Sequence, residues 1–212
     1  MVEIRLYVEG GGNSKVLRTA CRQGFSAFLS KAGLVSHMPR IVACGGRRHA
    51  YDDFCIALKQ GRAATLLVDS EDAIAPQHAQ DEPEEWRPWA HLAQRQGDQW
   101  SKPAGSTDLQ CHLMVQCMES WFLADRATLS AFFGQGYSAN ALPATGNPIE
   151  SVAKSVVYEA LANATKNCKT KDAYGKGEHS FLLLAQIDPA KVTAASKWAD
   201  RFVTTIRKSM GC

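Results

Sequence analysis

The apolar run Ala63–Val68, which ends at Asp69, constrains the fold more than any other segment of the chain. An apolar run without polar alternation is typical of a strand buried on both faces, as in a parallel sheet covered by helices. Val2–Val8 alternates and is rich in β-branched residues, which predicts another strand. Arg40–Ala43 predicts a third, short strand that ends before Gly45-Gly46.

Helical patterns separate these strands. From Lys15 to Ala32 the apolar residues fall on one helical face, and Asn13 or Ser14 is placed to cap that helix. A second helix is expected over Ala50–Lys59. Strands that alternate with helices are typical of parallel βαβ units. With a further strand expected at His112–Val115, the sequence predicts an α/β fold with a parallel sheet of about four strands flanked by helices.

Residues 70–108 interrupt this pattern, because they are polar and rich in Gln, Pro and Trp. We interpret them as a long excursion with one short helix near Glu84–Gln94. Its tryptophans either stack on nucleic-acid bases or anchor the excursion onto the core, and anchoring is the favoured interpretation. These residues are Trp86, Trp89 and Trp100.

The remainder of the chain is predicted to be mostly helical, over Met118–Phe133, Ile149–Ala164 and Pro189–Lys208. This predicts an α/β core over residues 1–125 and a helical C-terminal part, residues 126–212, packed on it. Within the net charge of +3, residues 151–212 hold ten Lys/Arg against five Asp/Glu. This basic surplus either follows a phosphodiester backbone or is a solvated helix face.

Several classes of protein are excluded or disfavoured. Residues Met1–Arg5 lack the pattern of a secretory signal, and the apolar runs are far shorter than the roughly 20 residues of a membrane span. We therefore expect a soluble cytoplasmic protein without a membrane partner. Cys111-His112 and Cys117 match no standard zinc spacing, so buried free thiols are the preferred interpretation.

The Gly-rich turn Glu9–Lys15 is the first segment with possible chemistry. A strand, a glycine turn and a helix N-terminus can bind phosphate through backbone N–H groups. The segment is neither a P-loop nor a Gly-x-Gly-x-x-Gly motif. Two interpretations remain open: a tight turn without a ligand, and a nucleotide-phosphate site that uses Gly10–Gly12.

Carboxylates gather at two predicted strand ends. Glu9 follows the first strand, and Asp69, Glu71 and Asp72 follow the apolar strand. A carboxylate at the end of a buried strand is costly without a partner, and crowded acids raise one another's pKa. Mg²⁺ or Mn²⁺ would remove this penalty, since both prefer hard oxygen ligands. A helix N-cap or a solvated acidic loop is the alternative.

These two motifs resemble the TOPRIM domain, which topoisomerases, primases and overcoming-lysogenization-defect (OLD) nucleases share. The resemblance rests on a strand ending in Glu9-Gly10 and a later strand ending in Asp69-Ser70-Glu71. The segments Leu113–Asp125 and Tyr174–His179 look like signatures of a bacterial family of uncharacterised TOPRIM-like proteins. Members of that family often occur beside ABC-type or SMC-like ATPases, in a manner similar to phage-defence operons.

The resemblance assigns roles to individual acids. Glu9 matches the acid of the first TOPRIM strand, and Asp69 and Glu71 match the Asp-x-Asp pair with Glu in the second place. Asp72 is a further carboxylate that could bind the ion. Glu119 and Asp125, six residues apart on a predicted helix, point to different faces and cannot bind the same ion without a bend. Glu119 is the better candidate ligand because it lies near the strand end, and charges on a helix surface are the alternative for both.

The basic half supplies candidates for substrate contact. Lys176 and His179 are expected in a loop before Phe181–Leu184. Lys176 could bind a phosphate or stabilise its transition state. His179 could bind phosphate or move a proton, although ordinary hydrogen bonding is the alternative. Gly10 and Gly11 are the expected backbone contacts to phosphate.

Together, these residues and the resemblance predict a metal-dependent nuclease subunit that acts on DNA or RNA with an ABC/SMC-like ATPase in antiphage defence. Glu9, Asp69, Glu71 and Lys176 would be its catalytic residues, with Mg²⁺ or Mn²⁺ as cofactor. The alternative is a non-catalytic regulatory or binding subunit with a degenerate TOPRIM site. The sequence leaves open whether the protein is a homo-oligomer.

Overall fold

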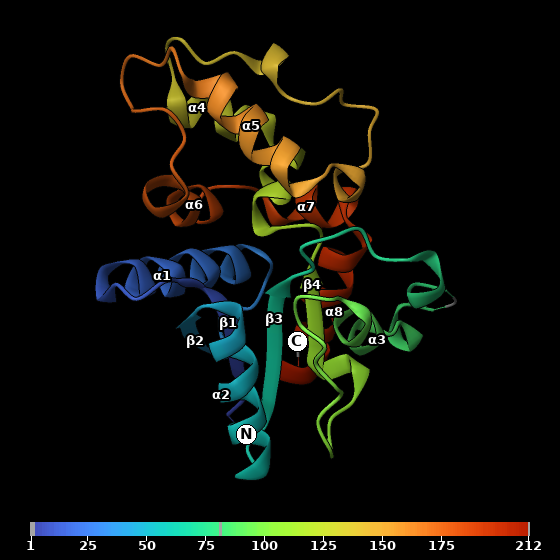
Figure 1. Cartoon of the computed structure of the whole chain (residues 1–212). Helices are drawn as coiled ribbons and strands as arrows, with labels where there is room; N and C mark the ends of the chain where they lie inside the picture. The colour runs from blue at the N-terminus through green and yellow to red at the C-terminus, as the bar shows by residue number, and fades with distance from the viewer. Residues whose placement is uncertain (1–2, 81, 212) are drawn as a thin grey trace.

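The computed structural model, described over residues 3–80 and 82–211, is an α/β fold built on four parallel strands (Figure 1). These are β1 (Arg5–Gly11), β2 (Arg40–Gly45), β3 (Ala64–Asp69) and β4 (Cys111–Met114), in the order β2-β1-β3-β4. The predicted fold class is therefore confirmed. Val2, where the first strand was expected to begin, lies outside the described residues.

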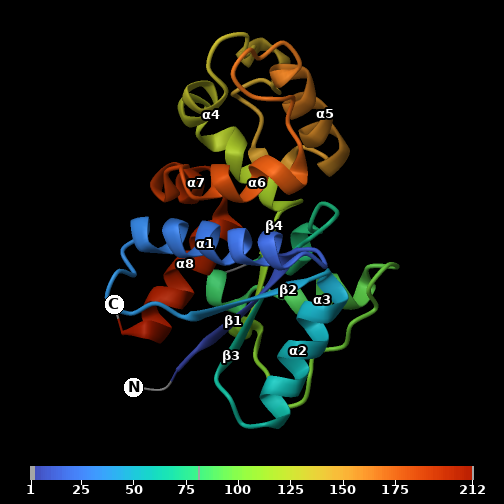
Figure 2. The ribbon, with the colours of Figure 1, turned by 90° about the vertical axis from the view of Figure 1, so that its left-hand side faces the viewer.

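Alternate residues of the strands supply two separate hydrophobic clusters. Leu6, Val8 and Leu67 belong to the cluster that contains residues of α1 (Lys15–Lys31) and α8 (Lys197–Met210). The intervening residues, such as Tyr7, belong to the cluster of α2 (Arg47–Lys59) and α3 (Pro88–Gln94). Figure 2 shows these helices around the sheet. All six residues of β3 are buried, as expected for a central strand covered on both faces.

Two helix starts have consequences for the site. Ser14 caps α1, since its side chain accepts a hydrogen bond from the backbone N–H of Leu17. Helix α2 begins at Arg47, three residues before the predicted start at Ala50. The difference brings Arg47 into the first turn of α2, directly after the glycines that end β2.

The helical C-terminal part is more broken than expected. The predicted helix Met118–Phe133 is a 3-10 helix, Met118–Ala124, followed by α4 (Arg126–Phe133), because Asp125 caps a new helix. The predicted helix Pro189–Lys208 is divided into α7 (Pro189–Ala195) and α8, and Ser196 caps the second. Helix α5 (Lys154–Thr165) begins later than predicted, after a 3-10 turn over Ile149–Ser151.

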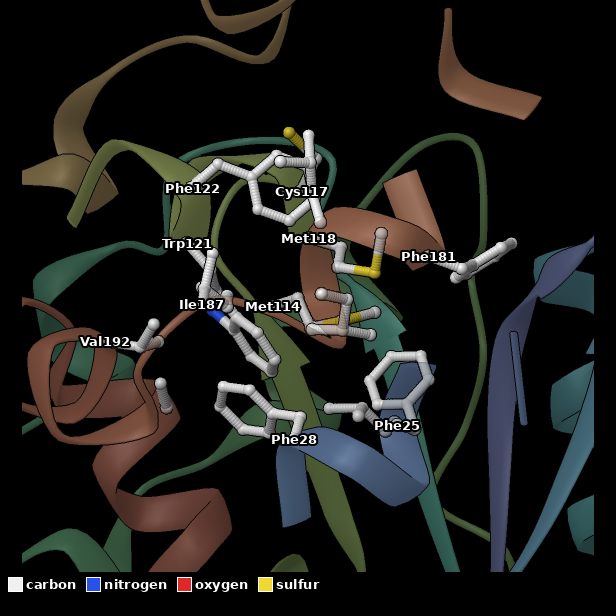
Figure 3. Packing of buried hydrophobic residues seen from close by; sticks show 14 of the residues in the cluster. Phe25, Phe28, Met114, Cys117, Met118, Trp121, Phe122, Phe181, Ile187 and Val192 are labelled. Carbon is white, nitrogen blue, oxygen red and sulfur yellow. The ribbon is translucent and has the colours of Figure 1, made fainter. Parts of the chain in front are cut away.

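The prediction of a loop around Lys176 and His179 is wrong, because both residues lie in α6 (Lys176–Leu184). Helices α4 to α7 lie above the carboxyl ends of the strands (Figure 1). A buried cluster attaches this helical cap to the sheet, with Phe25 and Phe28 of α1 below Met118 and Trp121 (Figure 3). The rings of Phe28 and Trp121 stack with centroids 5.1 Å apart.

The three tryptophans of the excursion are buried. Trp89 packs on Phe54 of α2, and Trp100 stacks on Tyr51 with centroids 4.6 Å apart. Anchoring is therefore the correct interpretation, and base stacking by these side chains is excluded by their burial. The expected helix Glu84–Gln94 consists of a 3-10 turn and α3. Among the described helices, none is long and apolar enough to cross a bilayer.

Candidate functional site

Three carboxylates meet at the carboxyl edge of the sheet. Glu9 lies near the end of β1, Asp69 is the last residue of the adjacent β3, and Glu71 follows two residues later. One carboxylate oxygen from each lies within 4.8 Å of the other two. The predicted convergence of these three acids thus occurs, because neighbouring parallel strands end at the same edge. We refer to Glu9, Asp69 and Glu71 as the acidic triad.

Backbone hydrogen bonds orient the acidic triad. The Asp69 Oδ1 accepts a hydrogen bond from the N–H of Met118 at 2.9 Å, and the Asp69 N–H donates to Glu9 Oε2 at 3.2 Å. Glu71 has a left-handed backbone with φ of 69°, which costs a non-glycine residue roughly 1–2 kcal/mol. Its N–H donates to the carbonyl of Gln116 at 2.8 Å, which helps to hold this conformation.

Two basic side chains contact the acidic triad. The Arg47 Nη1 lies 3.3 Å from Glu9 Oε2 and 3.6 Å from Glu71 Oε1. The Lys154 Nζ, at the start of α5, lies 3.1 Å from Asp69 Oδ2 and 2.7 Å from Glu71 Oε1. Neither residue was expected from the sequence. Lys154 therefore connects the helical cap directly to the edge of the sheet.

Arg47 also fixes the excursion to the site. Its guanidinium donates to both carboxylate oxygens of the buried Asp98, at 2.8 and 2.5 Å, and to the carbonyl of Asp69 at 2.6 Å. It also lies over the ring of Trp100, 4.9 Å from the centroid. Arg95 also pairs with Asp98, at 3.2 Å, and with Asp72, so three cations are shared among the acidic triad, Asp98 and Asp72.

The electrostatics of the acidic triad follow from its burial. Burial raises the pKa of Glu9, against the opposing influence of Arg47. Burial, and then the charges of Glu9 and Glu119, raise the pKa of Asp69 to about 7. Burial alone would lower the pKa of Lys154, but Asp69 and Glu71 outweigh it and raise that pKa. The charged forms of Glu9 and Asp69 are therefore costly and would be favoured by a further cation.

Two other predicted ligands lie outside the acidic triad. Asp72 is largely exposed and pairs with Arg95, whose Nε lies 3.0 Å from Asp72 Oδ2. Asp125, the weaker candidate, accepts hydrogen bonds from Thr128 and pairs with Lys191 at 2.6 Å. Its role is to cap α4. The structure therefore does not bring Asp72 or Asp125 to the three acids.

Glu119 is fully buried, and its carboxylate accepts hydrogen bonds from three hydroxyl groups. Tyr158 donates to Oε2 at 2.9 Å, while Tyr174 and Ser180 donate to Oε1 at 3.2 and 3.1 Å. These three donors come from α5, the segment before α6, and α6 itself. Glu119 thus holds the helical cap together beside the acidic triad, and it is not one of the three acids whose oxygens converge.

A pocket of about 390 Å³ adjoins the acidic triad. Carboxylates, glycines, Lys176 and apolar side chains line it, as follows: Glu9, Gly10, Gly11, Gly12, Leu17, Gly45, Asp69, Met118, Glu119, Lys176, Gly177 and Phe181. Gly11 has φ of 88°, and a Cβ atom there would lie 2.7 Å from the Cα of Arg18. The turn therefore requires glycine where it approaches α1.

The structure separates the two basic candidates. Lys176 lines the pocket, and its Nζ donates to the hydroxyl of Tyr158 at 2.8 Å. His179 is buried, and its Nδ1 accepts a hydrogen bond from the Gly175 N–H at 3.0 Å. Its ring packs on Phe133. Lys176 therefore lines the same pocket as Glu9 and Asp69, whereas His179 supports the start of α6 and lies outside the lining of this pocket.

Fold and site together define an α/β protein with an acidic triad at the carboxyl edge of a parallel sheet. The chain belongs to the family described as Domain of unknown function (DUF4276), which matches residues 8–207. No curated protein and no solved structure matches the chain.

Proposed function

We propose that this protein is a TOPRIM-like nuclease subunit that hydrolyses phosphodiester bonds with Mg²⁺ or Mn²⁺. The observation that carries the proposal is the convergence of Glu9, Asp69 and Glu71 within 4.8 Å beside a pocket that Lys176 also lines. Its action on DNA or RNA, and its work with an ABC/SMC-like ATPase in antiphage defence, follow from the resemblance to TOPRIM-like proteins.

The donor set fits a hard divalent cation. All three groups offer carboxylate oxygens, which Mg²⁺ and Mn²⁺ prefer to nitrogen or sulfur ligands. The acids come from two rigid strand ends and one hydrogen-bonded turn, so their positions are fixed by the backbone. Arg47, Lys154 and Arg95 are shared among five carboxylates, those of the acidic triad, Asp98 and Asp72, which leaves net negative charge that a divalent ion would offset.

Each group of residues has a distinct role in this proposal. The acidic triad would hold the ion, which when bound supplies activation of water and neutralisation of the leaving oxygen. The ammonium of Lys176, which lines the same pocket, would contact the phosphate charge. Gly10 and Gly11 line the same pocket, and their backbone would contact the phosphate. Arg47 and Lys154 orient the carboxylates, and Lys154 opposes the rise in the pKa of Glu9 and Asp69.

The test incubates the full chain with Mn²⁺ and single- or double-stranded DNA or RNA, each with and without a candidate ABC/SMC-like ATPase partner. Cleavage is expected with the native protein and with Asp72→Asn, since Asp72 pairs with Arg95 outside the acidic triad. Glu9→Gln and Asp69→Asn are expected to abolish it. The proposal fails if no substrate is cut, or if Glu9→Gln and Asp69→Asn cut as well as the native protein.

A second candidate function is favoured by the basic contacts. Arg47 and Lys154 pair with all three acids, so the negative charge is already partly neutralised within the chain. This arrangement suits a regulatory or binding subunit whose TOPRIM-like site holds no metal. Calorimetry separates the two functions, because such a site takes up no ion at millimolar Mn²⁺, whereas the nuclease site does.

A further inference from the structure

The pocket beside the acidic triad is lined by two chemically different kinds of side chain. The charged ones are Glu9, Asp69, Glu119 and Lys176, and the apolar ones are Leu17, Met118 and Phe181. These apolar residues come from α1, the 3-10 helix after β4, and α6. A pocket with apolar walls and a few converging charges is typical of a site that binds one small amphipathic molecule.

The size of the pocket restricts what can enter. Its volume of about 390 Å³ lies near the lower end of the ~300–1,000 Å³ range of small-molecule sites. A base that is stacked and paired in a duplex cannot enter such a pocket without leaving the helix. An unpaired nucleotide, or a nucleotide at a strand end, can enter the pocket without first leaving a helix.

A chain of hydrogen bonds orients the ammonium of Lys176 at the pocket. The Lys176 Nζ donates to the Tyr158 hydroxyl at 2.8 Å, and that hydroxyl donates to the buried Glu119 at 2.9 Å. The Nζ also lies 3.9 Å from Glu119 Oε1. Lys176 is about half exposed, yet these contacts hold its ammonium near the pocket. An immobilised ammonium is suited to binding one phosphate group.

We propose that this pocket binds a single nucleotide unit, with the phosphate between Lys176 and the acidic triad and the base against Leu17, Met118 and Phe181. The proposal rests on the nuclease function proposed above, since the three carboxylates would repel the phosphate unless a divalent cation lay between them. It narrows the substrate class to nucleotides at strand ends or in unpaired segments. Intact duplex is not a substrate.

Two variants on α1 test this proposal by calorimetry. The probes are adenosine 5′-monophosphate and inorganic phosphate, each titrated into the full chain with millimolar Mn²⁺. Leu17→Trp enlarges a half-buried side chain that lines the pocket, whereas Val16→Trp alters its exposed neighbour, which does not line it. Native protein and Val16→Trp are expected to bind the nucleotide at least tenfold more tightly than phosphate.

Leu17→Trp is expected to lose at least tenfold in nucleotide affinity and to retain its affinity for phosphate and for Mn²⁺. Lys176→Met, which removes an exposed charge, is expected to weaken the binding of nucleotide and of phosphate alike. It replaces Leu17→Trp as the test variant if Leu17→Trp does not fold. The proposal is overturned if the nucleotide binds no more tightly than phosphate, or if folded Leu17→Trp binds it as the native protein does. It is also overturned if Lys176→Met leaves both affinities unchanged.

Failure of this inference and failure of the proposed nuclease are distinguishable. Nucleotide binding that Leu17→Trp abolishes, without Mn²⁺-dependent cleavage of any substrate, supports the pocket and contradicts the nuclease. Mn²⁺-dependent cleavage of covalently closed duplex DNA, at the same rate in native protein and Leu17→Trp, supports the nuclease and overturns the single-nucleotide pocket.

Discussion

Replacement of Lys154 by methionine preserves the length of the side chain and removes the ammonium that pairs with Asp69 and Glu71. Both distances, 3.1 and 2.7 Å, are those of direct ion pairs, and the Lys154 side chain is 22% exposed. Exposed pairs contribute ~0.2–1 kcal/mol, and breaking a buried pair costs about 3–5 kcal/mol. For this intermediate burial we expect the free energy of unfolding to fall by about 1–3 kcal/mol in EDTA.

Mn²⁺ should reverse part of this loss. In the native protein the ammonium must leave the carboxylate oxygens before an ion can occupy them, whereas in Lys154→Met they are free of it. The variant is therefore expected to bind Mn²⁺ at least tenfold more tightly, which corresponds to about 1.4 kcal/mol. Its thermal midpoint should consequently rise more on addition of Mn²⁺ than that of the native protein.

Lys191→Met is the matched control, because Lys191 pairs with the buried Asp125 at 2.6 Å outside the acidic triad. Its response to Mn²⁺ should equal that of the native protein. Thermal unfolding of the three proteins, in EDTA and in a series of Mn²⁺ concentrations, measures both effects. The reasoning is refuted if Lys154→Met is as stable as the native protein in EDTA, or if Mn²⁺ stabilises it no more than the native protein.

Three further predictions concern the surroundings of the site. Gly11→Ala should lower the free energy of unfolding by at least about 1–2 kcal/mol in urea titrations, because its Cβ would lie 2.7 Å from the Arg18 Cα; a native midpoint would contradict this. Arg201→Met should lower the free energy of unfolding by about 3 kcal/mol or more, because the buried Arg201 donates hydrogen bonds to three backbone carbonyls. A decrease below about 1 kcal/mol in the same titrations would contradict this. In the folded protein the pKa of Asp69 is raised to about 7, whereas in the unfolded chain it is about 4. The free energy of unfolding should therefore fall as pH rises from about 4 to 7, because Asp69 loses its proton more easily in the unfolded chain. Asp69→Asn should therefore gain stability relative to the native protein between pH 5 and pH 8 in EDTA, and a constant difference across this range would argue against the shift.

The sheet and the acidic triad were predictable because both depend on local patterns. A strand buried on both faces needs an apolar run such as Ala63–Val68, and the residues that end parallel strands meet at one edge. The convergence of Glu9 with Asp69 and Glu71 follows from this rule without knowledge of side-chain positions. The burial of the excursion's tryptophans also follows from a general expectation, that large aromatic side chains anchor long loops.

Arg47 and Lys154 could not be found in the same way. Each begins a helix far from the acids in sequence, so only the packing of α2 and α5 brings it to the edge of the sheet. Lys176 and His179 were expected in a loop, and Gly175 and Gly177 do weaken helix propensity there. The packing of α6 against α1 overrides this preference.

Isothermal titration of Mn²⁺ into the full chain, compared with Glu9→Gln and Asp72→Asn, tests the central assignment most directly. The two substitutions each remove one carboxylate charge, but Glu9 belongs to the acidic triad and Asp72 pairs with Arg95 outside it. A saturable Mn²⁺ site that persists in Asp72→Asn and disappears in Glu9→Gln is the predicted result. The assignment is contradicted if the native chain binds no Mn²⁺ at millimolar concentration, or if Glu9→Gln binds it as the native chain does.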